Sequence, residues 1–203
     1  GLRVAPWLVV RSDDMADVTG VVAGVVDGIG LPVFIKPAEL GSSVGVSKAT
    51  TEAEVKEGLE LAFRHGSKVI VEEAIRGREI EVGVLDGPRA SMPGEIVIET
   101  DWYDYDAKYR DETSRFEAPA RLNGAQTARV RSLAAEAFTA LECRGLARVD
   151  FLFEEGGRGF LLNEVNTMPG FTPISGFPKM WQASGMTYPE LCDELVRAAL
   201  GAG

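Results

Sequence analysis

The sequence predicts an α+β protein rather than a doubly wound parallel sheet. Segments with the alternating apolar pattern of strands are interspersed with segments whose apolar residues recur every three to four positions, as they do in helices. These segments do not follow a regular strand–helix–strand order. The chain contains no internal repeat and no low-complexity segment. We therefore expect one or two ordinary globular domains.

Composition and charge argue against several classes of function. Of the 203 residues, 45% are hydrophobic and 26% are charged, which is typical of a soluble globular protein. The sequence has no run of 18 or more apolar residues, the length needed to span a membrane. Residues 1–20 lack the features of a signal peptide. The net charge of −10 argues against nucleic-acid and anionic-membrane partners. The two cysteines form neither a disulfide framework nor a metal-binding pattern, which favours the reducing cytoplasm.

Strands are expected where short apolar runs are bounded by glycine, proline or polar residues. The expected strands span residues 7–10, 32–36, 44–47, 69–73, 79–85, 94–99, 146–153 and 160–165. The segment 154–159, Glu-Glu-Gly-Gly-Arg-Gly, would join the last two strands as a hairpin.

Helices are expected where apolar periodicity coincides with capping residues. The expected helices run from Ser12 to Ile29, from Thr51 to about Gly66, through residues 130–141, and from Thr187 onward. Gly30 is expected to close the first helix. Thr51 with Glu54, and Thr187 with Glu190, have the spacing of capping boxes.

A glycine- and serine-rich segment follows the strand that ends at Lys36. Residues 41–45, Gly-Ser-Ser-Val-Gly, offer backbone N–H groups and two hydroxyls to phosphate oxygens. This is not a Walker loop, because Lys48 lies beyond the last glycine and a strand follows instead of a helix. An ordinary Gly-Ser hairpin loop is the alternative. Lys36 favours phosphate binding, because a lysine that ends an apolar strand must reach solvent or an anion.

The last two expected strands carry a cluster of charged and amide side chains. Arg148 and Asp150 are two residues apart and share one face, and so do Glu164 and Asn166 on the next strand. Two carboxylates and an amide oxygen at one place suit an Mg²⁺ ion that also binds substrate phosphates. The alternative is a cross-strand ion pair between Arg148 and Glu164 at a solvated edge.

Whether these groups meet depends on the hairpin between the two strands. A five-residue loop at 155–159 would place Asp150 opposite Glu164. A two-residue turn at 156–157 would place Asp150 opposite Asn163 and separate the groups. We expect the longer loop, with Asn163 pointing to the opposite face.

Two further segments are candidates for binding. Residues 102–109, Trp-Tyr-Asp-Tyr-Asp-Ala-Lys-Tyr, are too aromatic for a linker and too polar for a core strand, so we expect a lid or binding loop there. A packed surface loop is the alternative. Ser175 follows a Pro-Gly-Phe-Thr-Pro segment and could bind a carboxylate, although residues 172–175 would more often form an ordinary turn. With His65 as the single histidine, catalysis by a Ser-His-Asp group is not expected.

Five segments together resemble the D-alanine–D-alanine ligase family of ATP-grasp enzymes. In chain order they read IKPAELGSSVGVSK, VEEAIRGREIEVGVL, WYDYDAKY, LARVDF and LNEVNTMPGF. The resemblance covers nearly the whole chain and implies the ATP-grasp fold, in which two α+β subdomains grip ATP between antiparallel sheets. It implies a central subdomain over residues 1–80, with its phosphate loop at 41–47, and a C-terminal subdomain over 81–203, with a lid loop at 100–115.

The resemblance also implies roles for individual residues. ATP would be bound by Lys36, Ser43, Glu72, Ala74, Ile75, Glu79 and Leu152. Two Mg²⁺ ions, with Mn²⁺ as an alternative metal, would be held by Asp150, Glu164 and Asn166. The groups acting on the reacting atoms would belong to Arg148, Lys108, Ser42, Tyr109 and Gly170. The carboxylate of the second substrate would be bound by Ser175.

The implied reaction joins two D-alanines through an acylphosphate, using ATP, for peptidoglycan precursor synthesis. The implied partners are D-alanine, ATP and a second copy of the full-length protein. The nearest alternative is a ligase that joins D-alanine to D-lactate or D-serine, although Tyr109 in the lid favours the dipeptide-forming type. A non-catalytic ATP-grasp nucleotide-binding module is a second alternative, and the presence of Lys36, Arg148 and Glu164 argues against it.

Two departures from the family pattern qualify these expectations. The family's chain normally begins with a substrate-binding domain, whereas residue 1 here already corresponds to the central domain. We therefore expect this polypeptide alone to bind Mg·ATP weakly without turning over. Glu73 replaces the lysine expected near the adenine, so that contact stays open.

Overall fold

The computed structural model describes residues 1–41, 44–98 and 114–201. The chain divides into two compact units, which we call the small unit (Ala5–Ile75) and the large unit (Gly1–Val4 with Arg76–Gly203). The boundary falls after Ile75, whereas the resemblance placed it after residue 80. Over the described ranges, no helix has the length and apolar character needed to cross a membrane.

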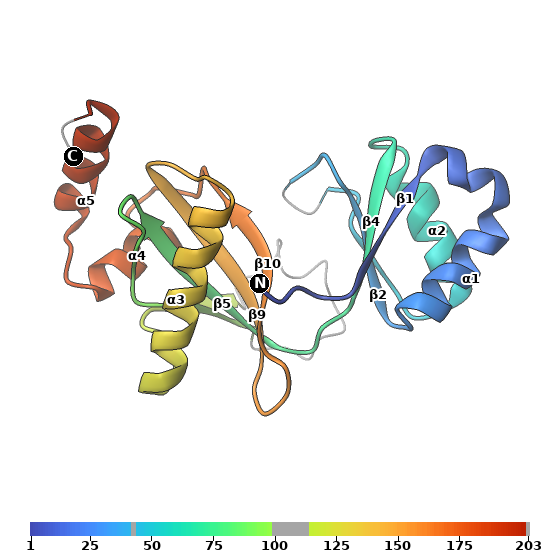
Figure 1. Ribbon diagram of the computed structural model, residues 1–203, viewed down its shortest axis with the longest axis horizontal. Coiled ribbons are helices and arrows are strands. Elements are labelled where there is room, and N and C mark those ends of the chain that lie inside the picture. Colours follow the sequence, from blue (N-terminus) through green and yellow to red (C-terminus); the bar gives the residue numbers. More distant parts are fainter. Residues whose placement is uncertain (42–43, 99–113, 202–203) are drawn as a thin grey trace. The chain divides into compact units, whose positions relative to one another are not determined.

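The small unit consists of a four-stranded antiparallel sheet and two α-helices (Figure 1). Its sheet has the order β1-β4-β2-β3, formed by β1 (Trp7–Arg11), β2 (Val33–Pro37), β3 (Ser47–Ala49) and β4 (Lys68–Glu73). Its helical segments are the 3₁₀ turn η1 (Ser12–Asp17), α1 (Val18–Gly28) and α2 (Glu52–Ala62). Alternate residues of the central strands, such as Ile35 and Val71, are fully buried in the core with the helices. The intervening residues therefore lie on the face of the sheet away from the helices.

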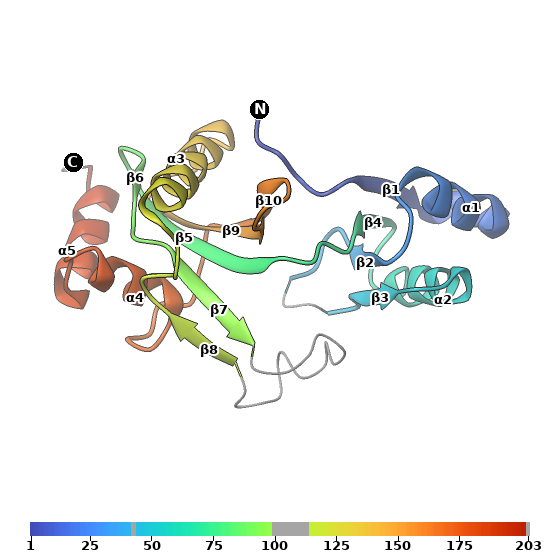
Figure 2. The ribbon, with the colours of Figure 1, turned by 90° about the horizontal axis from the view of Figure 1, so that it is seen from below.

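The large unit is built on a single antiparallel sheet with the order β10-β9-β5-β7-β8 (Figure 2). Its strands are β5 (Arg78–Leu85), β6 (Arg89–Ala90), β7 (Gly94–Ile98), β8 (Ser114–Glu117), β9 (Leu146–Glu154) and β10 (Gly159–Asn166). Its helices are α3 (Gly124–Ala140), α4 (Gly176–Ala183) and α5 (Tyr188–Ala199). The short strand β6 pairs with the end of β5.

Helices cover the two faces of this sheet differently. Helix α3 packs Val130 and Phe138 onto the buried residues of β9, among them Val149. Helix α4 packs on the other face of β5, where Gly83 leaves room for it. A Cβ atom at Gly83 would lie 2.9 Å from Nε1 of Trp181. The rest of that face, on β5, β9 and β10, carries the polar side chains described below.

The first helix begins later than expected. We predicted a start at Ser12, but Ser12–Asp17 form a 3₁₀ turn and α1 begins at Val18. The side chain of Asp17 accepts the N–H of Gly20 at 3.0 Å and caps α1 in place of Ser12. The threonine caps predicted for α2 and α5 are both present.

Three elements were not expected from the sequence. Strands β6 and β8 are short, and α4 spans only Gly176–Ala183. Strand β8 begins at Ser114, so the last two residues of the predicted lid are strand residues. The remainder of the lid prediction, 100–113, lies outside the described residues.

Candidate functional site

One face of the large unit's sheet carries polar side chains from three neighbouring strands. Residues directly opposite each other on antiparallel strands point to the same face. Glu81 of β5 is opposite Asp150 of β9, which in turn is opposite Glu164 of β10. Arg148 is opposite Asn166. The four groups singled out from the sequence therefore share one face, as predicted, and Glu81 joins them.

A β-bulge at Asn163 produces this arrangement. Leu162 is opposite Phe151, and Glu164 is then opposite Asp150, so Asn163 is the extra residue. Leu162 packs against the core beneath α3. Strict alternation along β10 would place Glu164 on the same apolar face as Leu162. The bulge reverses the alternation and turns Glu164 to the polar face.

The cause that we predicted for this pairing was wrong. We expected a five-residue loop at 155–159, but β10 already begins at Gly159. The first pairs of the hairpin follow the register of a turn centred on residues 156–157. Our expectation that Asn163 points to the opposite face assumed an uninterrupted strand, whereas this residue sits exposed at the bulge.

Arg148 lies at the centre of the charged groups on this face. It donates from Nε and Nη2 to the two carboxylate oxygens of Asp150, at 2.7 and 2.6 Å. Its Nε also lies 3.4 Å from Oε1 of Glu81. Burial alone would lower the pKa of Arg148, but the hydrogen bonds and charge of Asp150, and the charges of Glu81 and Glu164, raise it. Burial also raises the pKa of Asp150, although Arg148 opposes that shift.

The donor set of Asp150, Glu164 and Asn166 fits a magnesium ion chemically, because all three offer hard oxygen ligands. Asp150 is oriented by Arg148. The side-chain oxygen of Asn166 accepts the N–H of Met168 at 2.9 Å, which orients its amide and holds the turn after β10. In the part of the chain that the structure describes, no group of three or more His, Cys, Asp and Glu side chains is arranged to hold a metal. A metal here would therefore depend on the amide as well as the carboxylates.

The segment between β10 and α4 is held in place by several hydrogen bonds. Ser175 immediately precedes α4, and its Oγ accepts the N–H of Thr172 at 3.1 Å. The N–H of Ser175 in turn donates to the carbonyl of Thr172 at 2.9 Å, so the turn foreseen as an alternative is present. At the start of α5, Tyr188 donates its hydroxyl to the carbonyl of Phe171 at 2.8 Å. Gly170, just before this anchored stretch, is exposed.

In the small unit, Lys36 and Glu72 form an ion pair on the face of the sheet away from the helices. The Nζ atom of Lys36 lies 2.5 Å from Oε2 of Glu72, and the two side chains are 28% and 23% exposed. Both were singled out as ATP contacts, so a bound phosphate would compete with Glu72 for the ammonium group. Ala74 and Ile75, the predicted adenine neighbours, are buried.

The remaining site residues divide into two groups. Those outside the described residues are Ser42, Ser43, Lys108 and Tyr109. Glu79 and Leu152 are opposite each other on β5 and β9, on the same face as Asp150. Glu81, which we did not predict, has the same spacing from Glu79 that linked the other pairs, so strand alternation contained the signal for it.

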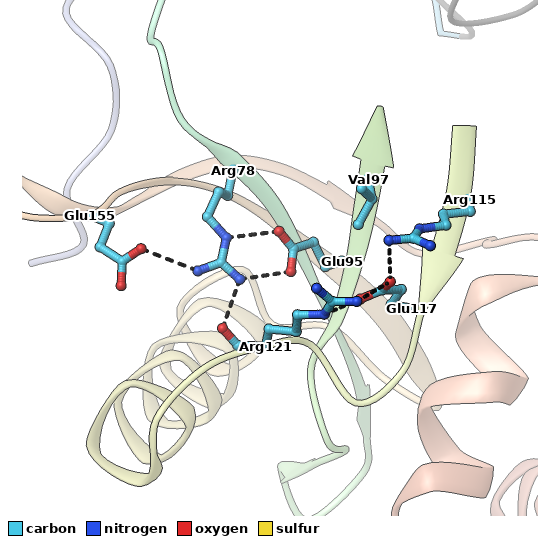
Figure 3. Close-up of a pocket in the computed structure, with 7 residues that line it drawn as sticks. All are labelled: Arg78, Glu95, Val97, Arg115, Glu117, Arg121 and Glu155. Atoms are coloured by element: carbon cyan, nitrogen blue, oxygen red, sulfur yellow. Dashed lines mark hydrogen bonds and ion pairs between the residues drawn. The ribbon is translucent and has the colours of Figure 1, made fainter. Parts of the chain in front are cut away.

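A separate pocket of about 360 Å³ opens on the large unit (Figure 3). Its lining residues are Arg78, Glu95, Val97, Arg115, Glu117, Arg121 and Glu155. Arg78 precedes Glu79 on β5 and therefore faces the other side of the sheet. Arg78 binds both carboxylate oxygens of Glu95 at 2.7 Å, and Glu117 pairs with two further arginines. Because positive and negative groups compensate each other, this pocket is poorly suited to a phosphate.

Replacing Arg78 with methionine should lower the free energy of unfolding by about 2–3 kcal/mol, because Glu95 loses two charge-assisted hydrogen bonds. Glu95 is only 8% exposed, so water replaces those bonds poorly. Urea denaturation measures the change. Arg121→Met is the matched control, since the Arg121 side chain is 74% exposed and its removal should cost no more than about 0.5 kcal/mol. An equal loss in both variants would contradict the prediction.

The sequence matches known ligases over almost its whole length. Residues 1–197 match the family model described as D-ala D-ala ligase C-terminus. The chain is 50% identical to the D-alanine–D-alanine ligase of Streptomyces coelicolor, in an alignment covering 98% of this chain and 53% of that protein. It is 47% identical to D-alanine–D-alanine ligase A of Chromobacterium violaceum, covering 100% of this chain and 56% of that protein. The chain thus spans about half the length of these relatives.

Solved structures agree with the sequence comparison. The D-alanine–D-alanine ligase from Coxiella burnetii superposes with a TM-score of 0.85 at 35% identity, over 99% of this chain and 53% of that one. The VanG D-Ala:D-Ser ligase from Enterococcus faecalis superposes with a TM-score of 0.85 at 32% identity, over 97% of this chain and 57% of that one. The mixed architecture with antiparallel sheets matches the expected ATP-grasp fold. The chain therefore belongs to the D-ala D-ala ligase C-terminus family.

Proposed function

We propose that this chain provides the ATP-grasp part of an enzyme that joins two D-alanines, using ATP, in peptidoglycan precursor synthesis. The observation that carries the proposal is the polar face on β9 and β10, where Asp150 is opposite Glu164 and next to Arg148. The two carboxylates could hold the metal ions that phosphoryl transfer to a carboxylate requires. The guanidinium group of Arg148 could stabilise the developing oxyanion. The names of the relatives agree with this reaction.

The proposal includes ATP binding. The proposed contacts are Lys36, Ser43, Glu72, Ala74, Ile75, Glu79 and Leu152. Two Mg²⁺ ions would be held by Asp150, Glu164 and Asn166, whose oxygen donors fit that metal. When bound, the metal would neutralise charge on the transferring phosphate. The ammonium group of Lys36 would add to that neutralisation.

The reaction would proceed in two steps. An oxygen of the first D-alanine's carboxylate attacks the γ-phosphorus of ATP, and the bond to the bridging oxygen of ADP breaks. The amine of the second D-alanine, after losing a proton, then attacks the carbonyl carbon of the acylphosphate, and inorganic phosphate leaves. We assign stabilisation of the oxyanion to Arg148 and the N–H of Gly170. Ser175 would bind the second substrate's carboxylate, and Ser42 would act from the loop that covers the phosphates. A lid containing Lys108 and Tyr109 would exclude water.

The same proposal includes a cytoplasmic location, where ATP is available, and a homodimer of the full-length protein. A second candidate is a ligase that uses D-serine as the second substrate. It is supported by the structural match to the VanG D-Ala:D-Ser ligase, whose TM-score of 0.85 equals that of the D-alanine–D-alanine ligase from Coxiella burnetii. The two candidates share the same proposed ATP and metal contacts and the same attack by an amine, so they differ only in the side chain of the second substrate.

The test is an ADP-release assay on the full-length protein encoded by the gene, with D-alanine alone or with D-serine or D-lactate as competitor. We expect D-alanine-dependent ADP release with D-alanyl-D-alanine as the main product by mass spectrometry. Lys36→Met should lower kcat by about a hundredfold, because the γ-phosphate loses a cation during transfer. Lys56→Met is the control, since that lysine is half exposed on α2. Absence of D-alanine-dependent ADP release would overturn the proposal, and a mixed product with D-serine would favour the second candidate.

A further inference from the structure

Glu81 is a buried carboxylate that has no part in the function proposed above. It is 7% exposed and lies at the middle of β5, opposite Asp150. Burying a carboxylate is costly unless a cation or hydrogen-bond donors compensate it. Its Oε1 atom lies 3.4 Å from Nε of Arg148, which provides the cation.

The second oxygen of Glu81 points to a different part of the site. A Cβ atom at Gly176 would lie only 3.1 Å from Oε2 of Glu81 and 2.9 Å from the ring of Phe116. Gly176 is the first residue of α4 and follows Ser175. The absence of a side chain at this position allows the start of α4 to lie against the carboxylate. A negative charge beside the first turn of a helix is also favourable.

A metal bound to Asp150 would leave its oxygens less available to Arg148, so a second carboxylate partner would help to hold the guanidinium group. Asp150 is both the two-pronged partner of Arg148 and a proposed magnesium ligand, so these two demands on its oxygens compete. Glu81 is not among the proposed ligands, and its carboxylate contacts Arg148 from the neighbouring strand. Glu81 is therefore able to hold the guanidinium group whichever partner Asp150 has.

We propose that Glu81 is a positioning residue that holds the guanidinium group of Arg148 against the start of α4, so that Arg148 and Ser175 keep a fixed relative geometry. This role rests on the proposed ligase function. Glu81 does not touch the reacting atoms and acts through Arg148. A small displacement of a group that stabilises a transition state is enough to slow the reaction substantially.

The test compares Glu81→Gln with Glu95→Gln in the full-length protein. Both residues are buried carboxylates of the same sheet that pair with an arginine, but Glu95 faces the other side, toward Arg78. We expect E81Q to lower kcat for D-alanine ligation by about ten- to a hundredfold, with the KM for ATP unchanged. E95Q should leave kcat within about twofold, although it loses thermal stability. E81D, which keeps the charge, should retain more activity than E81Q. It replaces E81Q as the test variant if E81Q does not fold.

A double-mutant cycle separates positioning from general stability. In an Arg148→Lys background, E81Q should change kcat by no more than about twofold, because the group it positions has already been replaced. Equal kcat for E81Q and wild type, equal losses in E81Q and E95Q, or a full E81Q effect in the R148K background would each overturn the role. A wild-type protein without D-alanine-dependent ADP release would overturn the ligase function itself, and the role of Glu81 with it.

Discussion

Glu164→Gln is expected to lower kcat for D-alanine ligation by about a thousandfold while leaving the protein folded. The proposed metal site would lose one of its two carboxylates, and charge neutralisation by a bound cation contributes several kcal/mol to such transition states. The side chain of Glu164 is exposed and is opposite Asp150. In the wild-type protein these two like charges face each other across the strands. Replacing one of them by a neutral amide should therefore relieve their repulsion and not weaken the fold.

The matched control for this prediction is Asn163→Ala, one residue earlier on the same strand. Asn163 is also exposed, but it is the extra residue at the bulge and no role is assigned to its side chain. We expect N163A to retain wild-type kcat within a factor of about three. Activity is measured by ADP release at saturating ATP across a Mg²⁺ titration, and folding by urea denaturation. Unchanged ligation in E164Q would contradict the metal-binding role proposed for Glu164.

The bulge at Asn163 shows where sequence reasoning succeeded and where it failed. We predicted that Asp150 is opposite Glu164, and this pairing is confirmed, although the bulge produces it. The loop length that we used to justify the pairing was wrong. The structure shows what the bulge achieves, since Leu162 and Val165 both pack against the core while lying three residues apart. Strict alternation cannot place both on one face, so a bulge between them was required.

Other features could not be predicted from local pattern. Helix α4 is short, contains Pro178 and begins at a glycine, so neither its propensity nor its caps identified it. Its place is decided by tertiary packing against Gly83, a contact between residues far apart in the sequence. The burial of Glu81 likewise depends on Gly176 and Phe116 converging on it from other elements. Strand alternation indicates which face Glu81 is on, but not how deeply it is buried.

Arg148→Met is expected to destabilise the protein by about 3–5 kcal/mol, the largest stability effect that we predict, because it removes the guanidinium group that pairs with buried carboxylates. The exposed fractions of the Asp150 and Glu81 side chains are 16% and 9%, so water cannot fully replace the guanidinium group. Arg148→Lys should recover only part of the loss, because an ammonium group cannot reproduce the two-pronged contact with Asp150.

The cause can be separated from lost packing by a second substitution. Arg148→Met with Asp150→Asn should be more stable than R148M alone, because the unpaired carboxylate that creates most of the cost is no longer present. Arg115→Met is the control, since Arg115 lies on the same sheet with a side chain that is 52% exposed, and it should change stability by no more than about 0.5 kcal/mol. Stabilities are compared from the urea concentrations at the unfolding midpoints. The comparison requires that the free energy of unfolding has the same dependence on urea in each variant. If R148M unfolded at the wild-type midpoint, Arg148 would not be what compensates the carboxylates on this face, and its placement would then need a functional rather than a structural explanation.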